Sequence, residues 1–499
     1  MEQEFDLLII GGGINGTAIA RDAAGRGLSV CLCERDDLAN HTSSASTKLI
    51  HGGLRYLEHY EFSLVRDSLK EREVLLRSAP HIIWPMRFIL PYDKGLRPKW
   101  MLRAGLFLYD NLGGREILPG TKTVDLGKAP HKTVLEDRLK TGFEYSDCWV
   151  EDARLVVLNA VDAKLKGADI RTRTEVSALT VTQDGYKAVL KKSDETTVSI
   201  RAKGVVNAAG PWVEEVLLKL KSRKNSSSLR LVKGSHIVTR KLFEGDHAYI
   251  FQNADERIIF AIPYEGDYTL IGTTDVPYTD KTEAVEASSA EISYLCDAAN
   301  EYFLSDISPD DVVWTYSGVR PLYDDQSTDA SEVTRDYVLN LDEFSEGAPF
   351  LSVYGGKITT SRKLAEHVTE KLSNFFKFGP KWTKPASLPG GDIKNADFEG
   401  FYQTIVSEFP DIDTKILRRL CRGYGTRIRE ILKECVTSQD LGRNFGAGLT
   451  EAEIRYLVAE EWVTTPDDVL WRRSKLGLHM SELERTEFSD WFVNGFKKV

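Results

Sequence analysis

The first 34 residues place the strongest constraint on the fold of this chain. Residues 5–10 (FDLLII) form a short apolar run typical of a buried strand, and Gly11-Gly12-Gly13 follow at once. Residues 14–26 (INGTAIARDAAGR) have the small, amphipathic pattern of a helix, and SVCLCE at 29–34 is a second apolar strand. Because strands joined by a crossover helix run parallel, the sequence predicts an α/β fold built on a parallel sheet.

The glycines between the first strand and the helix have the spacing of a dinucleotide-binding turn. Gly11, Gly13 and Gly16 alone are weak evidence, but here they follow a strand, open a helix and are answered by Glu34 at the end of the next strand. Glycine lets a pyrophosphate approach the free amides of the helix, and Glu34 can accept the hydroxyls of the adenosine ribose. NAD and FAD both fit this pattern.

The next segment separates the two cofactors. Residues 42–57 are too polar and glycine-rich for a regular element, and several of them can wrap a long cofactor: Thr42, Ser43, Ser46, Lys48, Leu49 and His51. A solvated serine-rich loop would explain the first half of this segment but not Leu49-Ile50-His51. The segment therefore favours FAD.

The rest of the chain predicts additional antiparallel strands, a linker and a helical C-terminal domain. Residues 170–200 and 229–275 alternate like antiparallel strands, with a hairpin turn at Asp184-Gly185, whereas SGVRP and YGGKITTS near 314–361 suggest glycine-rich turns. A helix is expected from 362 to 376, a Pro/Gly/Lys-rich linker at 377–396, and helices beyond it. We predict a Rossmann-like FAD-binding domain interleaved with a β-rich substrate cap over residues 1–385, and a helical domain over 386–499.

Composition excludes several classes of protein. The 65 lysines and arginines against 75 acids give a net charge of −10, which argues against nucleic acid as a partner. No run approaches the roughly 18 apolar residues of a membrane-spanning helix, and the N-terminus lacks the features of a signal peptide. The six scattered cysteines indicate core thiols in a reducing cytoplasm, with no metal site and no disulfide.

Four longer motifs carry a family resemblance. The segments 42–75, 143–156 (FEYSDCWVEDARLV), 314–322 (WTYSGVRPL) and 354–367 (YGGKITTSRKLAEH) resemble the FAD-dependent glycerol-3-phosphate dehydrogenases, which are D-amino-acid-oxidase-like flavoproteins. The resemblance runs from Phe5 to Trp471-Arg472-Arg473. It implies oxidation of sn-glycerol 3-phosphate to dihydroxyacetone phosphate, with electrons passed to a membrane quinone. A homodimer is compatible with it.

A phosphate ester needs local cations, and the chain offers four beside predicted turns: Arg55, Arg320, Arg335 and Lys357. The resemblance makes Arg320 and Lys357 the main phosphate ligands, with Tyr56 and Thr274 as hydroxyl contacts. Arg55 and Arg335 come second, and a surface ion pair explains Arg335 equally well.

The proton of the substrate hydroxyl needs an acceptor, and His51 is our candidate because histidine titrates near working pH. A structural or flavin-contacting role for His51 is an equal alternative; His236 and a path without a dedicated base remain open. Together with His51, Arg320 and Lys357 form the predicted catalytic set. The resemblance also brings five residues close to the flavin: Gly210, Trp212, Gly318, Gly356 and Thr359.

One segment suggests peripheral contact with the cytoplasmic face of a membrane. Between residues 94 and 115, five basic residues interleave with Trp100, Met101 and Phe107. A helix packed on the enzyme body explains the pattern equally well, and the C-terminal SDWFVNGFKKV is a second candidate. Rival functions are a soluble oxidase that uses oxygen and a non-catalytic flavin-binding redox module.

Overall fold

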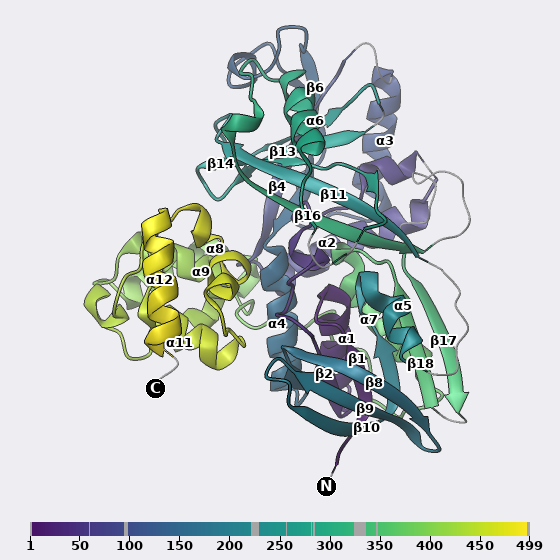
Figure 1. Ribbon diagram of the computed structural model, residues 1–499. Helices are drawn as coiled ribbons and strands as arrows, with labels where there is room; N and C mark the ends of the chain where they lie inside the picture. Colours follow the sequence, from purple (N-terminus) through teal and green to yellow (C-terminus); the bar gives the residue numbers. More distant parts are fainter. Residues whose placement is uncertain are drawn as a thin grey trace.

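The computed structural model describes residues 2–58, 60–93, 98–220, 229–255, 257–280, 282, 285–323, 336–345 and 348–496. Two sheets fill the first three quarters of the chain, and a group of helices at the C-terminus stands to one side of them (Figure 1). The predicted combination of a Rossmann-like domain, an interleaved β-rich cap and a helical C-terminal part is confirmed.

The first sheet is the dinucleotide-binding body. Its parallel centre has the order β18-β10-β1-β2-β7, with β18 at Ala348–Tyr354, β10 at Thr197–Asn207, β1 at Gln3–Ile10, β2 at Val30–Cys33 and β7 at Asp169–Arg171. Antiparallel strands extend it: β17 (Val338–Ser345) pairs with β18, and β8 (Thr174–Thr182) and β9 (Gly185–Lys192) form a meander with β10. The predicted hairpin at Asp184-Gly185 is confirmed because β8 and β9 pair up to Thr182 and Gly185.

Both faces of this sheet are covered. Leu7 and Ile9 of β1 pack with α1 (Ile14–Gly25), α4 (Asp152–Leu165) and α7 (Ser361–Lys371). Leu8 and Ile10 pack with the β8–β9 meander and α5 (Val213–Leu218). Successive side chains of a strand point to opposite faces, so the part of a strand that is covered on both sides must be apolar, as LLII at 7–10 is.

The second sheet forms the cap (Figure 1). Its order is β15 (Val276–Pro277), β11 (Leu229–Arg240), β14 (Tyr268–Gly272), β13 (Ile258–Tyr264), β12 (Ala248–Gln252), β4 (Ile83–Pro91), β6 (Thr141–Val150) and β3 (Leu49–Ile50). Two further strands pair at its sides, β16 (Val312–Tyr323) with β11 and β5 (Lys122–Asp125) with β6. The predicted antiparallel character holds except between β4 and β12. Helices α2 (Phe62–Ser78) and α3 (Lys99–Leu112) cover one face, and α6 (Ser289–Asn300) covers the other.

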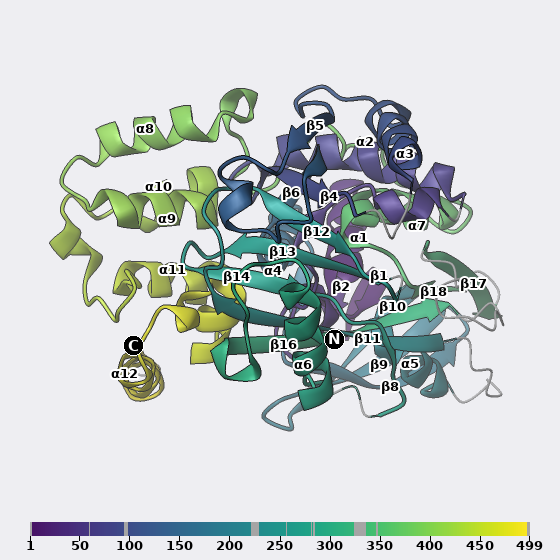
Figure 2. The ribbon, with the colours of Figure 1, turned by 90° about the horizontal axis from the view of Figure 1, so that it is seen from above.

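The C-terminal helices lie to one side of the two sheets in a second view as well (Figure 2). Their apolar core is their own and includes residues from Ile393 to Phe492. They are α8 (Phe398–Glu408), α9 (Thr414–Tyr424), α10 (Ile428–Ile431), α11 (Glu451–Glu460) and α12 (Glu482–Asn494), with a π-helical turn at Asp468–Arg473. Ser481 caps α12 by accepting from the amide of Glu484.

Two local predictions are wrong. SGVRP does not form a turn but lies inside β16, because Gly318 and Arg320 pair with Gly234 and Val232 of β11. The helix expected to reach 376 ends at Lys371. The predicted linker at 377–396 connects the flavin body to the C-terminal helices, and it is packed on that body, since Trp382 lies against Arg21 and donates to the carbonyl of Asp22.

Three further features of the described residues concern thiols, metal ligands and membrane-spanning helices. All six cysteines are free and buried. Within the described residues, no group of three or more histidine, cysteine or acidic side chains is arranged to hold a metal ion. Within the same residues, no helix combines the length and the apolar character needed to cross a bilayer.

Candidate active site

An open cleft of about 1080 Å³ lies at the carboxyl ends of β1 and β10, where ligands bind in parallel α/β sheets. Its wall includes the turn after β1, the start of α1 and the turn at 208–212. Gly11 has φ +110°, and a Cβ at this position would lie 2.5 Å from the carbonyl oxygen of Ala208. A Cβ at Gly16 would lie 1.9 Å from the carbonyl oxygen of Gly11. Only glycine therefore allows α1 to begin this close to the turn.

The start of α1 offers backbone amides that can bind an anion. Gly13 precedes the helix without a side-chain cap, so backbone amides of the first turn face the cleft without a capping carboxylate. The amide of Ile14 donates to the hydroxyl of Ser43 at 2.9 Å. Gly11 and Gly13 line the cleft, whereas Gly16 lies behind the turn and sets the packing of the helix.

Glu34 forms the acidic wall of the cleft. One carboxylate oxygen accepts from the amide of Gly12 at 2.6 Å, and the other accepts from the amide of Asp36 at 2.8 Å. Burial raises the pKa of Glu34, and the two backbone donors oppose this shift. Each oxygen keeps a lone pair for a further donor such as a ribose hydroxyl.

The outer end of the cleft is aromatic. Trp212 lies under the guanidinium of Arg35 at 4.1 Å and meets the ring of His41 edge-on at 4.6 Å. His41 pairs with Asp36 at 2.8 Å. An apolar plate beside a ribose-binding acid fits an adenine ring.

Two buried polar atoms test whether a cofactor fits here. Among the described residues of the cleft wall, Asn15 Oδ1 and Trp212 Nε1 have no protein hydrogen-bond partner. Buried polar groups are almost always satisfied, so a polar ligand completes this wall. The glycine turn, the open amides of α1, Glu34 and these two atoms together fit a dinucleotide.

The serine- and threonine-rich loop divides into two parts. Thr42 and Ser43 line the cleft. The side chains of Ser46 and Lys48 turn to Asp152 instead, and the Lys48 ammonium lies 2.8 Å from its carboxylate with no exposed surface. Leu49 lies in β3 and pairs with Trp149 of β6. The geometry thus assigns the side chains of Ser46 and Lys48 to holding the loop.

Residues expected near the flavin ring lie together beside Gly356 of the cleft wall, and we call this cluster the inner end of the site. The ammonium of Lys357 lies 3.6 Å from the centre of the Tyr56 ring, and the amide of His51 donates to the hydroxyl of Thr359 at 3.3 Å. Burial, then the cations of Lys357 and Arg72, lower the pKa of His51 to about 3. This imidazole is therefore unprotonated at physiological pH, and its affinity for a proton is low.

Gly356 has φ +99° and lines the cleft beside Gly355. The carbonyl of Gly355 accepts from the side-chain amide of Asn15 at 3.0 Å, which ties this turn to the start of α1. Gly210 has φ +57° and also lines the cleft. These positive φ angles are the reason why glycine occupies both turns.

Arg320 comes from the cap. Its guanidinium pairs with Asp275 at 2.8 Å and passes over Gly234, where a Cβ would lie 2.6 Å from Nη2. Gly318, two residues earlier on the same face of β16, packs against Ala45 in the serine- and threonine-rich loop at 42–48, which we call the cofactor loop. The alternation of the strand therefore turns Arg320 toward the cofactor loop.

Thr274 is buried behind this arginine. Its hydroxyl donates to Glu291 at 2.9 Å and accepts from the amide of Ser235 at 2.9 Å. Glu291 also pairs with Lys233 at 2.7 Å, and these donors lower its pKa to about 2 against the opposing effect of burial. This geometry assigns the Thr274 side chain to holding the turn at 273–275 rather than to touching a ligand.

The remaining candidates are placed as follows. Arg55 is half-buried beside Tyr56 in a 3₁₀ turn. His236 is buried, stacks on Tyr316 at 4.7 Å and bonds to the Thr47 hydroxyl at 3.0 Å. Arg335 lies outside the described residues.

Sequence reasoning missed Asn15, Arg35 and His41 as parts of the cleft wall. Asn15 lies inside the glycine fingerprint, and Arg35 and His41 lie between Glu34 and Thr42, so position in the motif was the available signal. Their contacts with Gly355 and Trp212 join segments far apart in the sequence, and only the fold reveals them.

The fold and the cleft define a two-sheet, dinucleotide-binding oxidoreductase with a cationic inner end. Residues 6–362 match the family described as FAD dependent oxidoreductase, and residues 381–486 match the C-terminal domain of alpha-glycerophosphate oxidase. The chain belongs to the FAD dependent oxidoreductase family, and its cofactor is FAD.

Curated relatives cover almost the whole chain. A D-erythritol 1-phosphate dehydrogenase of Brucella abortus (strain 2308) is 52% identical over 98% of both chains. An aerobic glycerol-3-phosphate dehydrogenase of Escherichia coli (strain K12) is 48% identical over 98% of this chain and 97% of its own. The crystal structure of a glycerol-3-phosphate dehydrogenase from Bacillus halodurans with FAD superposes with a TM-score of 0.76, at 28% identity, over 99% of this chain and 95% of its own.

Proposed function

We propose that this enzyme oxidises sn-glycerol 3-phosphate to dihydroxyacetone phosphate. The observation that carries the proposal is the Lys357 ammonium over Tyr56, close to a neutral His51, directly after Gly356 of the cleft wall. FAD, when bound, supplies the acceptor for the hydride from C2 of the substrate. Relatives named glycerol-3-phosphate dehydrogenase, at 48% identity, support the choice of substrate.

The cations of the site bind the phosphate in this proposal. Lys357 and Arg320 are its principal ligands, with Arg55, Tyr56 and Arg335 in support, whereas Thr274 acts only by holding the turn at 273–275. Each charge-assisted hydrogen bond contributes roughly 1.5–3 kcal/mol, so two of them favour the phosphate ester over glycerol by a large factor.

His51 takes the hydroxyl proton. Its low pKa keeps the ring unprotonated, and the cation of Lys357 is one cause of that low value. A phosphate dianion beside Lys357 offsets this cation, so substrate binding itself raises the basicity of His51. The base is thereby strengthened when the substrate is in place.

An anaerobic spectrum tests the central proposal. The purified protein should be yellow, and its visible flavin absorption should bleach when glycerol 3-phosphate is added without oxygen. Glycerol should cause no bleaching at the same concentration. A yellow protein that glycerol 3-phosphate does not bleach contradicts the proposal.

D-erythritol 1-phosphate is the second candidate substrate, because a relative of that specificity is 52% identical. Both compounds are phosphate monoesters of short polyols, so the same cations can hold either one. Anaerobic kcat/KM values for the two compounds on one preparation decide between them. Our choice requires glycerol 3-phosphate to be preferred by at least about tenfold, since one extra hydroxymethyl group is worth roughly 1–3 kcal/mol in a fitted pocket.

We further propose that a membrane quinone accepts the electrons. Oxygen is the rival acceptor, because the C-terminal residues match the C-terminal domain of an oxidase. Substrate-dependent reduction of a short-chain ubiquinone with little oxygen uptake supports the quinone. Rapid oxygen uptake without added quinone overturns it.

Membrane contact through α3 accompanies the quinone proposal. Trp100 and Phe107 on this helix are 70% and 67% exposed, whereas Leu106 and Tyr109 face the enzyme body. The helix is thus apolar on both sides, with Arg103 exposed among the outer residues. In the rival C-terminal segment, Phe492 is buried, which favours α3.

Sedimentation with vesicles that contain anionic lipid tests this contact. Trp100→Ser with Phe107→Ser should lower the bound fraction severalfold. Val436→Ser is the control, because Val436 is 69% exposed on the C-terminal part. Equal binding by both variants contradicts a docking role for α3 on the cytoplasmic face.

Two organisational proposals complete the assignment. We propose a domain boundary between residues 385 and 386, which the match of residues 381–486 to a separate C-terminal domain supports.

We also propose that the protein forms a homodimer. Light scattering of the detergent-free protein tests this proposal, because a homodimer has a mass of twice 56.1 kDa.

A further inference from the structure

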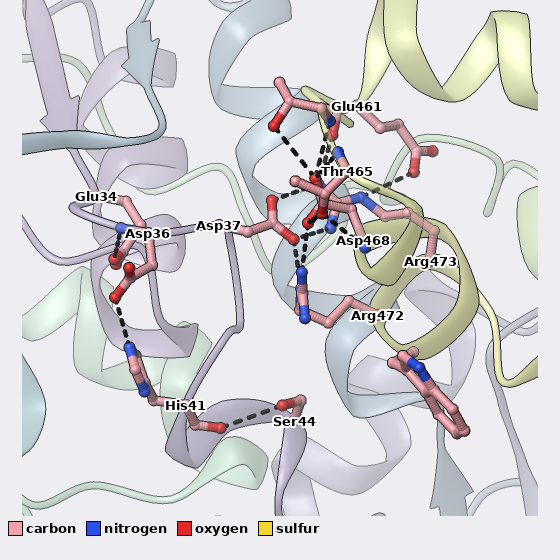
Figure 3. A network of polar contacts seen from close by, with 12 residues as sticks. Glu34, Asp36, Asp37, His41, Ser44, Glu461, Thr465, Asp468, Arg472 and Arg473 are labelled. Carbon is pink, nitrogen blue, oxygen red and sulfur yellow. Dashed lines mark hydrogen bonds and ion pairs between the residues drawn. The ribbon is translucent and has the colours of Figure 1, made fainter. Parts of the chain in front are cut away.

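A buried charge cluster joins the flavin body to the C-terminal helices. Asp37 is 2% exposed and sits between two consecutive arginines of the π-helical turn (Figure 3). Arg473 binds its carboxylate with both terminal nitrogens, at 2.6 and 2.8 Å, and Arg472 Nε approaches it at 2.6 Å. Three charge-assisted bonds therefore converge on one carboxylate across the contact between the two parts.

Asp37 belongs to the loop that forms the adenosine end of the cleft. Glu34, Arg35 and His41 of this loop line the cleft, while Asp37 faces the other way (Figure 3). The carbonyl of Gly12 accepts from the amide of Ala39 at 3.3 Å, so the loop also supports the glycine turn. The conformation of residues 34–41 thus sets the positions of the ribose acid and of the aromatic plate.

The two arginines are held from behind. Arg473 also donates to the carbonyl of Glu461 at 2.6 Å, and Arg154 of α4 binds the carboxylate of Glu461 at 2.9 Å. Arg472 also binds Asp468, and Asp468 in turn is bound at 2.9 Å by Arg173, which follows β7 in the flavin body. With both arginines anchored, Asp37 cannot move without leaving buried charges unpaired.

We propose that Arg472 and Arg473 are positioning residues for FAD: they hold Asp37 and so fix loop 34–41 in the conformation that binds the adenosine half of the cofactor. The C-terminal helices are in this respect an outer support of the cofactor site. The proposal rests on FAD as the cofactor but not on the identity of the substrate. Neither arginine needs to touch the cofactor.

Cofactor affinity of the apoprotein is the primary test. Arg473→Met should raise the dissociation constant for FAD by tenfold or more, measured by quenching of flavin fluorescence, and Arg473→Lys should raise it about threefold. Arg419→Met is the matched control, because Arg419 makes a bidentate pair with Glu453 wholly within the C-terminal helices, at 2.8 and 2.6 Å. This control should lower the thermal midpoint yet leave FAD affinity within twofold of the parent.

Two further readouts separate positioning from general stability. Competition by ADP should weaken by the same factor as FAD binding, because the effect lies at the adenosine end. The double variant Asp37→Asn, Arg473→Met should lose no more FAD affinity than Asp37→Asn alone, because the arginine acts through Asp37.

Several outcomes overturn the proposal. One is an Arg473→Met protein that binds FAD within twofold of the parent while its thermal midpoint falls as in Arg419→Met. Losses of affinity that multiply in the double variant contradict a route through Asp37. A parent apoprotein that does not bind FAD refutes the cofactor assignment instead, and this outcome is separate from the effect of the arginine.

Discussion

The two ends of the active site are built in different ways. At the nucleotide end, backbone atoms set the shape: Gly11 and Gly16 allow contacts that a Cβ would block, and Glu34 is held by two backbone amides. At the inner end, side chains from remote segments meet: the neutral His51 and Tyr56 come from one segment, and the cationic Lys357 comes from another.

Because the two ends are built from different groups, we expect FAD affinity and substrate oxidation to be lost independently of one another. A change in the backbone turn should alter how tightly FAD is held, whereas a change in the charged side chains should alter what is oxidised. Each of the following predictions therefore pairs an effect at one end with the absence of an effect at the other.

The largest effect is expected for Lys357→Met. Loss of the cation that faces the substrate phosphate should lower kcat/KM by about 1000-fold, equivalent to about 4 kcal/mol. The flavin content should stay at that of the parent, because the nucleotide end is untouched. Lys363→Met is the control, since Lys363 pairs with Asp67 at a partly exposed site. A colourless Lys357→Met protein breaks the proposed independence.

Gly16→Ala should produce the next largest effect, at the other end. The new Cβ would lie 1.9 Å from the carbonyl oxygen of Gly11, so α1 must shift away from the turn. We expect FAD affinity to fall by about 100-fold, and at saturating FAD the KM for glycerol 3-phosphate to stay within twofold. Gly423→Ala, where an added Cβ has no neighbour within 4 Å, should leave both values unchanged. A large rise in KM in Gly16→Ala would show that the two ends are coupled.

Glu291→Gln should have a moderate effect on the substrate end. This carboxylate bonds to Thr274, Lys233 and Ser235, and the turn it holds carries Asp275, the partner of Arg320. A neutral amide should loosen the turn and raise KM about tenfold with little change in kcat. Glu301→Gln, at the exposed end of the same helix, is the control. An equal effect of the two substitutions argues against the role of the turn.

The smallest effect concerns pH. A base works only when deprotonated, so activity falls as pH falls through its pKa. The pKa of His51 is lowered to about 3, so His51 should add no acid limb to log kcat/KM between about pH 5 and 9. A limb near pH 6 should come from the second ionisation of the substrate phosphate and should persist in His51→Asn. A limb near pH 6.5 that disappears in His51→Asn contradicts the neutral, shielded imidazole.

Sequence reasoning succeeded where neighbours in the chain are neighbours in space. The strand before Gly11, the helix after it and Glu34 belong to one βαβ unit, and local periodicity was enough to predict them. It failed for SGVRP, because glycine and proline were taken as turn signals while pairing with β11 holds these residues in β16. Tertiary pairing there overrides the local preference.

The amino-acid sequence was enough to predict the dinucleotide turn, because the contact between Gly16 and the carbonyl of Gly11 involves only a few neighbouring residues. It also determined which residue types a phosphate ester needs. Only the tertiary structure decided which of those candidates meet: it brought Lys357 to Tyr56 and His51, turned Lys48 to Asp152, and set Arg472 and Arg473 on Asp37, more than 430 residues away in the chain. The physical reason is that such charges are paired across the fold, and no local pattern records which buried partner each will find.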